Sequence, residues 1–311
     1  MNTKNCIASL IKFCIGTVLL SCTSFVAAND EPPKGDTVLR IGFFYPSISQ
    51  IADRTDILVS MNFWMQEISQ NFDQPAAQVQ LFDKIEVMQQ AYASGNINMV
   101  VAPPMSLAIH FDRNSLTDCM IGRRDKDKLD SLLLISRTNI RASSLMGLKD
   151  KHLLTPDNDE LAEIFLNLLT LKASNLPYTK FFGKVSRSKQ ARRMILDLFF
   201  DKADAALINQ TTYDVMLELN PQIANKVKIM EIYPLVSRSY SFVHPDYAMR
   251  ERLKSNYLKV AETARGRQLL TIYQHDALAF CDVHDLDKFD ALYAEYQKLM
   301  QKVSTPQKRK H

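Results

Sequence analysis

Residues 88–102 read MQQAYASGNINMVVA, which predicts the end of a helix, a tight turn and a buried strand. Gly95 ends the helix, because glycine readily adopts the left-handed backbone conformation that often closes one. The strand follows over 97–101 and stops at Pro103 and Pro104, which cannot donate to a sheet. A helix that leads directly into a strand is typical of α/β proteins, in which helices connect parallel strands.

The residues before this stretch complete a β-α-β-α-β series. The apolar segment 38–45 predicts a buried first strand, and apolar residues at helical spacing over 56–72 predict a helix with its first residue as the N-cap. A second strand is expected over 78–82. Asp83 stands three residues before Glu86, which predicts a capping box for the next helix.

The same order of elements returns later in the chain. Residues 152–155 and 205–208 have the composition of short buried strands, and residues 159–171 and 190–200 carry apolar side chains at helical spacing. The two series share an architecture and not a sequence repeat. The sequence therefore predicts two α/β lobes, each a mixed sheet flanked by helices.

Two apolar segments, 132–136 and 235–243, flank the second series and predict strands that cross between the lobes. Two crossings make a hinge. The expected lobes are residues 29–135 with 241–303 for the first and residues 136–240 for the second.

The C-terminal part of the chain is expected to be mostly helical. Residues 250–270 and 286–300 predict helices with charged outer faces that pack on the first lobe. The last segment, 304–311, reads STPQKRKH and is expected to be a disordered basic tail.

Residues 1–28 have the pattern of a secretory signal peptide. Two lysines precede or border an apolar run over 13–20, and Val-Ala-Ala at 26–28 offers small residues for cleavage. A transmembrane anchor needs about 20 apolar residues, and this run is too short. The segment 19–22 also resembles a lipobox, which leaves lipidation of Cys22 open as an alternative. Either route predicts an exported, periplasmic protein.

Cysteine usage agrees with export. Beyond the leader only Cys119 and Cys281 remain, an even number in a compartment where disulfides persist. A bridge between them and two separately buried thiols are both consistent with the sequence. Cys281 begins the segment 281–285, CDVHD, which contains metal-ligand residue types, but no second cluster has matching spacing, so no metal site is expected.

Composition argues against several classes of function. The chain has 46% hydrophobic and 23% charged residues and a net charge of +4, which is globular and too weakly basic for a generic nucleic-acid binder. The sequence carries no signature of a dinucleotide site, P-loop, zinc protease or serine hydrolase. We therefore expect no cofactor and no catalytic residue. Four histidines have neither metal-ligand spacing nor a paired nucleophile and are expected at the surface or at strand ends: His110, His152, His244 and His275.

Four segments together resemble a known family. They are 39–46 (LRIGFFYP), 92–100 (YASGNINMV), 144–151 (SLMGLKDK) and 202–213 (KADAALINQTTY). In this order they resemble the phosphate/phosphite/phosphonate ABC-transporter periplasmic substrate-binding proteins, as a divergent member. The resemblance covers roughly residues 38–300.

The resemblance implies a two-lobed clamshell, the type 2 periplasmic-binding-protein fold with two hinge strands. Such a protein closes over a small ligand and presents the closed form to a membrane partner. Carried over by position, the ligand would lie among loops that follow strand ends, which is where open α/β sheets bind ligands. The implied ligand-binding residues are Tyr45, Asp83, Pro104, Met105, Asp157, Asn158, Asp159, Ser188, Lys189, Asn209 and Tyr213. The rings of Tyr45 and Tyr213 suit stacking on an organic or quaternary ammonium group, and packing at the rim of a strand end is the alternative.

This chain departs from the family pattern at 155–160. Phosphonate binders of the family have Ser and Thr there, whereas this segment reads TPDNDE. Carboxylates at a helix N-terminus repel an incoming anion, by about 4 kcal/mol each at 4 Å and an effective dielectric of 20. We therefore expect weak binding of phosphate and phosphonate. The alternative is that Asp157 caps the helix while Asp159 and Glu160 point to solvent.

The opposite wall of the expected site is basic. Residues 186–189 read SRSK and precede a helix that carries Arg192 and Arg193. A solvated helix face is the alternative. If both walls contribute, the site is bipolar and suits a zwitterion.

The sequence thus predicts a periplasmic solute-binding protein that captures a small polar, zwitterionic or phosphonate-like ligand for an ABC importer. Its expected partners are the ligand and an inner-membrane permease, and not a nucleic acid. The alternative is a sensing module that docks on the periplasmic domain of a membrane receptor, a sensor kinase or a cyclic-dinucleotide enzyme, without serving transport.

Overall fold

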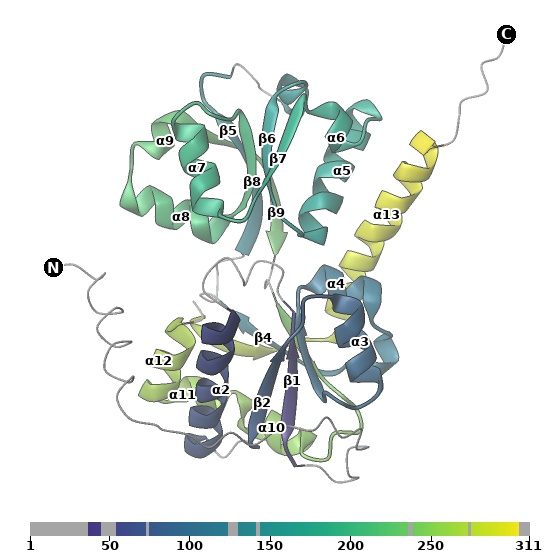
Figure 1. Cartoon of the computed structure of the whole chain (residues 1–311), viewed down its shortest axis with the longest axis vertical. Coiled ribbons are helices and arrows are strands. Elements are labelled where there is room, and N and C mark those ends of the chain that lie inside the picture. Colours follow the sequence, from purple (N-terminus) through teal and green to yellow (C-terminus); the bar gives the residue numbers. More distant parts are fainter. Residues whose placement is uncertain are drawn as a thin grey trace. The chain divides into compact units, whose positions relative to one another are not determined.

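The computed structural model describes residues 37–44, 54–72, 75–123, 130–140, 144–235, 239–272 and 275–304. They belong to one compact unit and form two separate sheets with helices on both faces of each (Figure 1). The predicted signal peptide, Cys22, Tyr45 and the tail beyond Ser304 lie outside the described residues.

The first sheet, sheet A, has the strand order β11-β4-β10-β3-β1-β2. Its strands are β1 (Leu39–Phe43), β2 (Ala77–Leu81), β3 (Met99–Ala102), β4 (Thr117–Arg123), β10 (Tyr240–Val243) and β11 (Ala277–Phe280). β1 runs parallel to both β2 and β3, as the β-α-β-α-β series predicts, and β10 is antiparallel to β3 and β4.

Helices cover both faces of sheet A. They are α2 (Arg54–Asn71), α3 (Ile85–Ala93), α4 (Pro104–His110), α10 (Arg250–Tyr257), α11 (Lys259–Glu262) and α12 (Ala264–Ile272), with a short 3-10 helix, η2 (Arg113–Ser115). Met61 of α2 and Leu253 of α10 pack in one apolar cluster with Leu39 and Ile41 of β1. Met88 of α3 packs on the opposite face with Val100.

The second sheet, sheet B, has the order β7-β6-β8-β5-β9. Its strands are β5 (Asp130–Arg137), β6 (His152–Pro156), β7 (Lys184–Ser188), β8 (Ala205–Asn209) and β9 (Val227–Leu235). Its helices are η3 (Leu145–Leu148), α5 (Glu160–Ser174), α6 (Tyr178–Phe181), α7 (Ala191–Phe199), α8 (Gln210–Leu219) and α9 (Ile223–Lys226). β6 runs parallel to β7 and β8, while β5 is antiparallel to β8 and β9.

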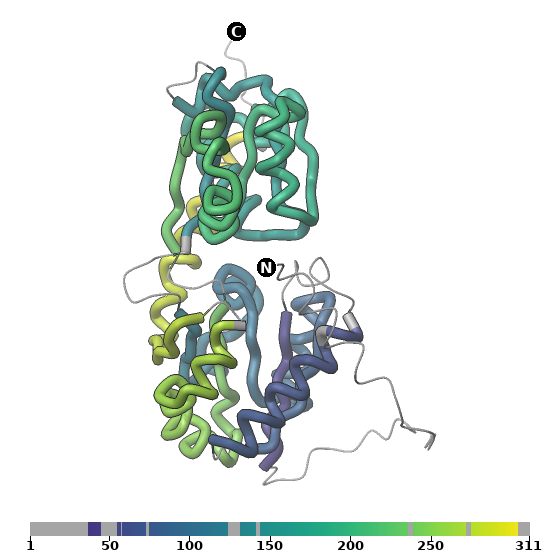
Figure 2. The backbone as a smooth tube through the Cα atoms, turned by 90° about the vertical axis from the view of Figure 1, so that its left-hand side faces the viewer, coloured from purple at the N-terminus to yellow at the C-terminus, as the bar shows by residue number. Residues whose placement is uncertain are grey.

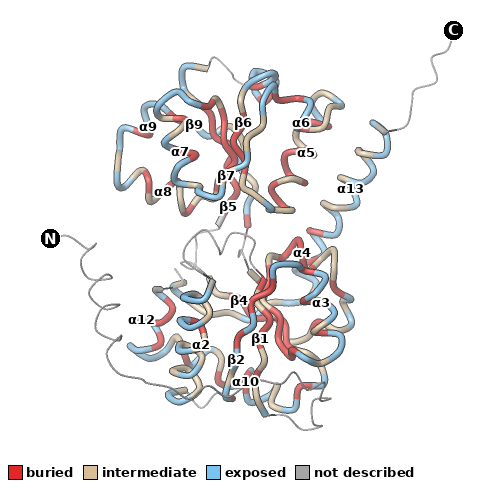
Figure 3. The backbone as a smooth tube through the Cα atoms, in the orientation of Figure 1, coloured by how far each residue is buried: buried red, intermediate tan, exposed pale blue. Residues whose placement is uncertain are grey.

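Burial follows the strand alternation in sheet B. Leu153 of β6 packs toward Phe165 of α5, whereas Leu154 packs toward Met194 and Leu198 of α7. The buried residues run along the middle strands, which are buried on both faces (Figure 3). This pattern explains why the middle strands β5, β6 and β8 contain consecutive apolar residues.

The chain passes twice between the sheets, from β4 to β5 and from β9 to β10. The segment 235–243 is therefore not one strand, because Leu235 ends β9 in sheet B and Tyr240 begins β10 in sheet A. The segment 132–136 lies wholly within β5 of sheet B. If the lobes are divided according to the two sheets, all of β5 belongs to the second lobe, although the expected second lobe begins at residue 136.

A third link is the C-terminal helix α13 (Asp287–Ser304), which follows the 3-10 helix η4 (Val283–Leu286). It packs against α4 beside sheet A and also against α5 beside sheet B (Figure 2). Lys172 of α5 forms an ion pair with Glu295 of α13 at 2.9 Å. The expectation that this helix packs on the first lobe is thus incomplete, because its apolar face continues past the end of α4.

Two helix starts differ from the sequence predictions. α2 begins at Arg54, so Asp56 lies inside its first turn and is not the N-cap. The capping box at Asp83 is wrong, because Lys84 is the N-cap of α3 and makes no side-chain capping bond. Phe82 and Ile85 are both buried, and this apolar anchoring sets the helix start.

The other boundaries are closer. Gly95 follows α3 with a φ of 74°, as its position predicts. Ser304 is the last residue of α13 and not the first residue of a tail.

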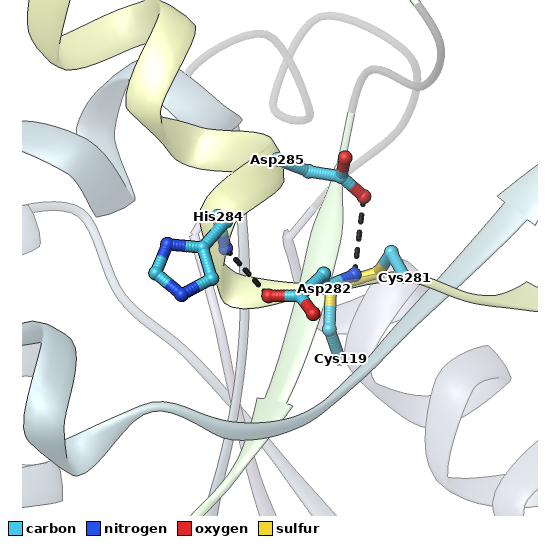
Figure 4. Close-up of a disulfide and its surroundings, with 5 residues drawn as sticks. All are labelled: Cys119, Cys281, Asp282, His284 and Asp285. Carbon is cyan, nitrogen blue, oxygen red and sulfur yellow. Dashed lines mark hydrogen bonds between the residues drawn. A yellow bond between two sulfur atoms is a disulfide. The ribbon is translucent and has the colours of Figure 1, made fainter.

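Cys119 and Cys281 form a disulfide with a Cα–Cα distance of 4.9 Å. Cys119 lies in β4 and Cys281 follows β11, which pairs antiparallel with β4, so sheet pairing brings the two cysteines together. The acids that follow Cys281 have a structural role. Asp282 and Asp285 form a capping box at η4, in which His284 N–H donates to Asp282 (Figure 4).

Candidate ligand site

Each sheet places polar loops at the carboxyl ends of its parallel strands. In sheet A, Asp83 follows β2 and Pro104 follows β3; in sheet B, Asp157 follows β6, Ser188 ends β7 and Asn209 ends β8. Parallel strands end at one edge of a sheet, so the residues within each set share that edge. These edges are where ligands of open α/β sheets bind.

The loops after β3 and β6 are connected by hydrogen bonds. Ser106 Oγ of α4 donates to Glu160 Oε2 of α5 at 2.5 Å, and His110 Nε2 lies 3.0 Å from Glu160 Oε1. Ser106 is buried, and the other two side chains are half-buried. Sequence analysis missed Ser106 and placed His110 at the surface or a strand end, because nothing in the sequence links polar residues 50 positions apart.

Asp159 is the N-cap of α5. Its carboxylate accepts a hydrogen bond from Ala162 N–H at 3.0 Å. Burial raises the pKa of this carboxyl, and the charges of Glu160 and Glu163 raise it further, while the backbone hydrogen bonds oppose the shift. The alternative in which Asp157 caps the helix and Asp159 and Glu160 point to solvent is therefore wrong.

The loop before α5 is shaped by its backbone. Asn158 has a φ of 54° and is exposed. Asp157 N–H donates to the carbonyl of Ser188 at 3.2 Å, which joins the loops after β6 and β7. These bonds bring Asp157, Asn158 and Ser188 to one place on sheet B.

The basic wall is partly neutralised. Arg187 forms an ion pair with Glu163 at 2.5 Å, and the negative charge of Glu163 is the first cause of the raised pKa of Arg187. Lys189, Arg192 and Arg193 are exposed. The charge of Arg187 is therefore used within sheet B, whereas no ion pair of the Lys189 side chain is found among the described residues.

Two further predicted site residues cap local structure. Ser188 Oγ accepts from Gln190 N–H at 3.2 Å, and Asn209 Oδ1 accepts from Thr212 N–H at 2.9 Å and from its hydroxyl at 2.7 Å. The amide nitrogen of Asn209 remains a donor on the edge of the sheet.

Met105 and Tyr213 belong to the core. Met105 is fully buried, and Tyr213 is 7% exposed among the apolar side chains between α7, α8 and sheet B. Burial also raises the pKa of Tyr213, followed by the charge of Asp214. A ring packed in this way offers no open face for stacking on a ligand.

Two buried hydroxyls that sequence analysis missed lie near the same edges. Thr155 is next to the last residue of β6, and Tyr240 pairs with Ala102, the last residue of β3. Within the described part of the chain, neither hydroxyl has a hydrogen-bond partner. An unsatisfied buried hydroxyl costs about 1–3 kcal/mol, so both are groups that a polar partner would stabilise.

A cavity of about 410 Å³ lies elsewhere, lined by Arg137, Asn139, Ile140, Gly147 and Lys151. Arg137 ends the antiparallel strand β5 and Lys151 precedes β6, so this cavity is at the end of sheet B opposite to the carboxyl ends of β6 and β8. Arg137 is bound to Asp201 and Asp204, which neutralise it. The position of this cavity and the neutralised charge of Arg137 both distinguish the cavity from the candidate ligand-binding residues at the carboxyl ends of the parallel strands.

Neither a metal cluster nor a membrane span is found in the described ranges. No group of three or more His, Cys, Asp or Glu residues there could hold a metal ion. No helix there is both long and apolar enough to cross a bilayer.

Comparison with solved structures supports the fold. The binding-protein component of a phosphonate ABC transporter from Pseudomonas aeruginosa is 15% identical over 89% of this chain and 90% of its own, with a TM-score of 0.64. A Xanthomonas citri protein bound to ATP is 14% identical over 86% of this chain and 99% of its own, with a TM-score of 0.61. PhnD1 of Prochlorococcus marinus, in complex with methylphosphonate, is 15% identical over 84% and 99%, with a TM-score of 0.61.

These likenesses establish the predicted type 2 periplasmic-binding-protein fold, with two mixed sheets each flanked by helices. No curated protein matches the sequence. The family model described as "ABC transporter, phosphonate, periplasmic substrate-binding protein" matches residues 52–286. Its members are binding proteins and not enzymes. The chain therefore belongs to the family of periplasmic substrate-binding proteins of phosphonate ABC transporters.

Proposed function

We propose that this substrate-binding protein captures a small polar ligand at the edges where the parallel strands of its two sheets end, for delivery to an ABC permease. The observation that carries the proposal is the bonding of Glu160 to Ser106 and His110, since it joins the loop after β6 to the loop after β3. A ligand held at this joint would contact both sheets. Closure signals to a membrane partner only when the ligand prefers the closed state.

The ligand we infer is polar and carries a cationic group. The carboxylates of Asp157 and Asp159 lie at the start of α5, and their negative charges would attract a positive group. Asn209 and Lys189 offer donors for an anionic group at the ends of β8 and β7. A zwitterion satisfies both sets, whereas a phosphate dianion satisfies only one. The fold relatives bound to methylphosphonate and ATP make phosphonates and nucleotides the necessary comparison compounds.

A second candidate is a sensing module that docks on a membrane receptor. The carboxylate-rich start of α5 favours it, because a protein that scavenges phosphonates would be expected to keep hydroxyls there. Gene neighbourhood separates the two. Adjacent permease and ATPase genes support import, whereas an adjacent sensor kinase or cyclic-dinucleotide enzyme supports sensing.

We further propose that the protein is exported and matures near Asn29. Mass spectrometry of the native protein tests this directly. A chain that begins at Asn29 supports cleavage of residues 1–28, and a lipidated N-terminal Cys22 supports the anchored form.

A thermal-shift screen of residues 29–311 across amino acids, polyamines, phosphonates and nucleotides tests the ligand proposal. A ligand that binds only the folded state at 100 times its Kd adds about 2.7 kcal/mol to the free energy of unfolding. We expect one zwitterionic class to raise Tm, and Lys189→Ala to reduce that rise. Lys151→Ala is the matched control, because Lys151 is an exposed lysine at the opposite end of sheet B. A protein that unfolds cooperatively and responds to no compound at millimolar concentration would contradict the proposal.

A further inference from the structure

The carboxylate of Glu160 is held on both oxygens by one face of α4. Ser106 donates to Oε2, and His110 lies within hydrogen-bond distance of Oε1. Ser106 and His110 are four residues apart on a helix and therefore lie on the same face. One face of α4 thus presents two polar side chains that can bind both oxygens of a carboxylate or another oxyanion. The side chain of Glu160, from a helix that packs on sheet B, already occupies this position.

Glu160 differs in this respect from its acidic neighbours on α5. Asp159 caps its own helix through Ala162, and Glu163 pairs with Arg187 on sheet B. Both therefore act within one sheet and its helices. Among the carboxylates described in the first turn of α5, Glu160 alone bonds to a helix of sheet A.

The surroundings make this contact more than a solvated surface pair. Ser106 is only 2% exposed, and the side chains of His110 and Glu160 are 22% and 37% exposed. Hydrogen bonds to an ionised group are roughly twice as strong as neutral ones, and partial burial reduces their screening by salt. The contact therefore helps to hold α4 and α5 together.

We propose that Glu160 is a tethered anion that latches the two sheets together and keeps anionic ligands away from Ser106 and His110. The contacts of Glu160 with Ser106 and His110 support the latch directly. The exclusion of anions rests on the proposed function, because it assumes that the ligand site includes this joint. An oxyanion that reached α4 would have to displace the carboxylate and overcome its charge.

The latch is tested without any ligand, by pulsed electron–electron resonance between spin labels on the two parts. Val87 of α3 and Leu219 of α8 are exposed and suit labelling after substitution by cysteine, while Cys119 and Cys281 remain bonded. In Glu160→Gln, we expect the ratio of long to short distances to rise about tenfold, which is the effect of losing one charge-assisted hydrogen bond. Ser106→Ala should shift the distances in the same direction.

Glu163→Gln is the matched control. It removes the same charge from the same helix, but Glu163 has no bond to α4. Its distance distribution should equal that of the wild type. Distributions that coincide for the wild type, Glu160→Gln and Ser106→Ala, in proteins with intact cooperative unfolding, would overturn the latch.

Calorimetry with methylphosphonate and inorganic phosphate tests the exclusion of anions. We expect Glu160→Gln to bind at least one of them about tenfold more tightly than the wild type, and Ser106→Ala added to that variant to remove the gain. An unchanged anion affinity in Glu160→Gln would contradict the proposal that Glu160 excludes anions. The proposal that Glu160 latches the two sheets is tested separately, by the distance measurement. The proposed function is judged separately by the thermal-shift screen of the wild type, so its failure and the failure of this inference are distinguishable.

Discussion

Asp159 accepts a hydrogen bond from the backbone N–H of Ala162 at 3.0 Å, so the first turn of α5 is bound by a carboxylate of the same chain. A helix N-terminus is an anion site because its free N–H groups and its dipole favour negative charge. Here Asp159 uses one of those groups and brings its own negative charge to the helix start. Asp159 therefore has a structural role as the N-cap of α5, and we expect its negative charge to weaken the binding of an anion there.

Replacing both carboxylates by hydroxyls should restore an anion site. Asp159→Ser keeps a capping oxygen for Ala162 N–H, and Glu160→Thr removes the second charge. We expect the double variant to bind methylphosphonate more tightly than the wild type in a calorimetric titration. Equal affinities would show that these side chains do not face the ligand.

The raised pKa of Asp159 gives a pH-dependent contribution to stability. A carboxyl whose pKa is higher in the folded state than in the unfolded state stabilises the fold when protonated, and this contribution is lost as pH rises through the folded pKa. Asn cannot ionise and caps helices as well as Asp does. As pH rises above about 4, the free energy of unfolding of Asp159→Asn should therefore increase relative to that of the wild type. Urea denaturation at several pH values measures this, and a constant difference would contradict it.

Asp204 should show the opposite sign. Burial raises its pKa, but His152 N–H and the Arg137 guanidinium lower it more, so the net pKa lies below the ordinary value. A depressed carboxyl pKa contributes stability above the unfolded pKa of about 4, and the contribution is lost as pH falls through the folded value. Asp204→Asn should cost about 1.5–3 kcal/mol at pH 7 and progressively less below pH 4. If the stability lost in Asp204→Asn stayed the same down to pH 2, this result would contradict a stabilising ion pair between Asp204 and Arg137.

Much of the fold could be predicted from the sequence, because hydrophobic periodicity reports burial directly. The apolar positions of 159–171 became the buried face of α5, and the strand signals at 97–101 and 205–208 became β3 and β8. Gly95 marked a helix end through its backbone alone. These features depend on neighbours within a few residues in the chain.

The candidate site was harder to predict. Ser106 and Glu160 are joined across 54 positions by a hydrogen bond, and polar residues at such a distance leave no periodic pattern. Tyr213 was expected to stack on a ligand from its place after a strand, but the first turn of α8 faces the core. The sequence also left the pairing of Cys119 and Cys281 open, because only the register of β4 with β11 brings them together.

Loss of the disulfide should destabilise the protein strongly. Cys119 and Cys281 are 162 positions apart, and closing a loop of this size is worth about 5 kcal/mol in the chain-entropy model. The Cys119→Ser, Cys281→Ser variant should show this loss in urea denaturation, and reduction of the wild type should approach it. A loss below about 1 kcal/mol would mean that the unfolded chain gains little freedom when the bond is removed.

We expect the start of α5 to select against phosphate-type anions, and isothermal titration calorimetry of the wild-type mature protein with methylphosphonate measures this selectivity. With Asp159 and Glu160 in place, we expect weak binding or none. A submicromolar Kd for methylphosphonate would contradict the claim.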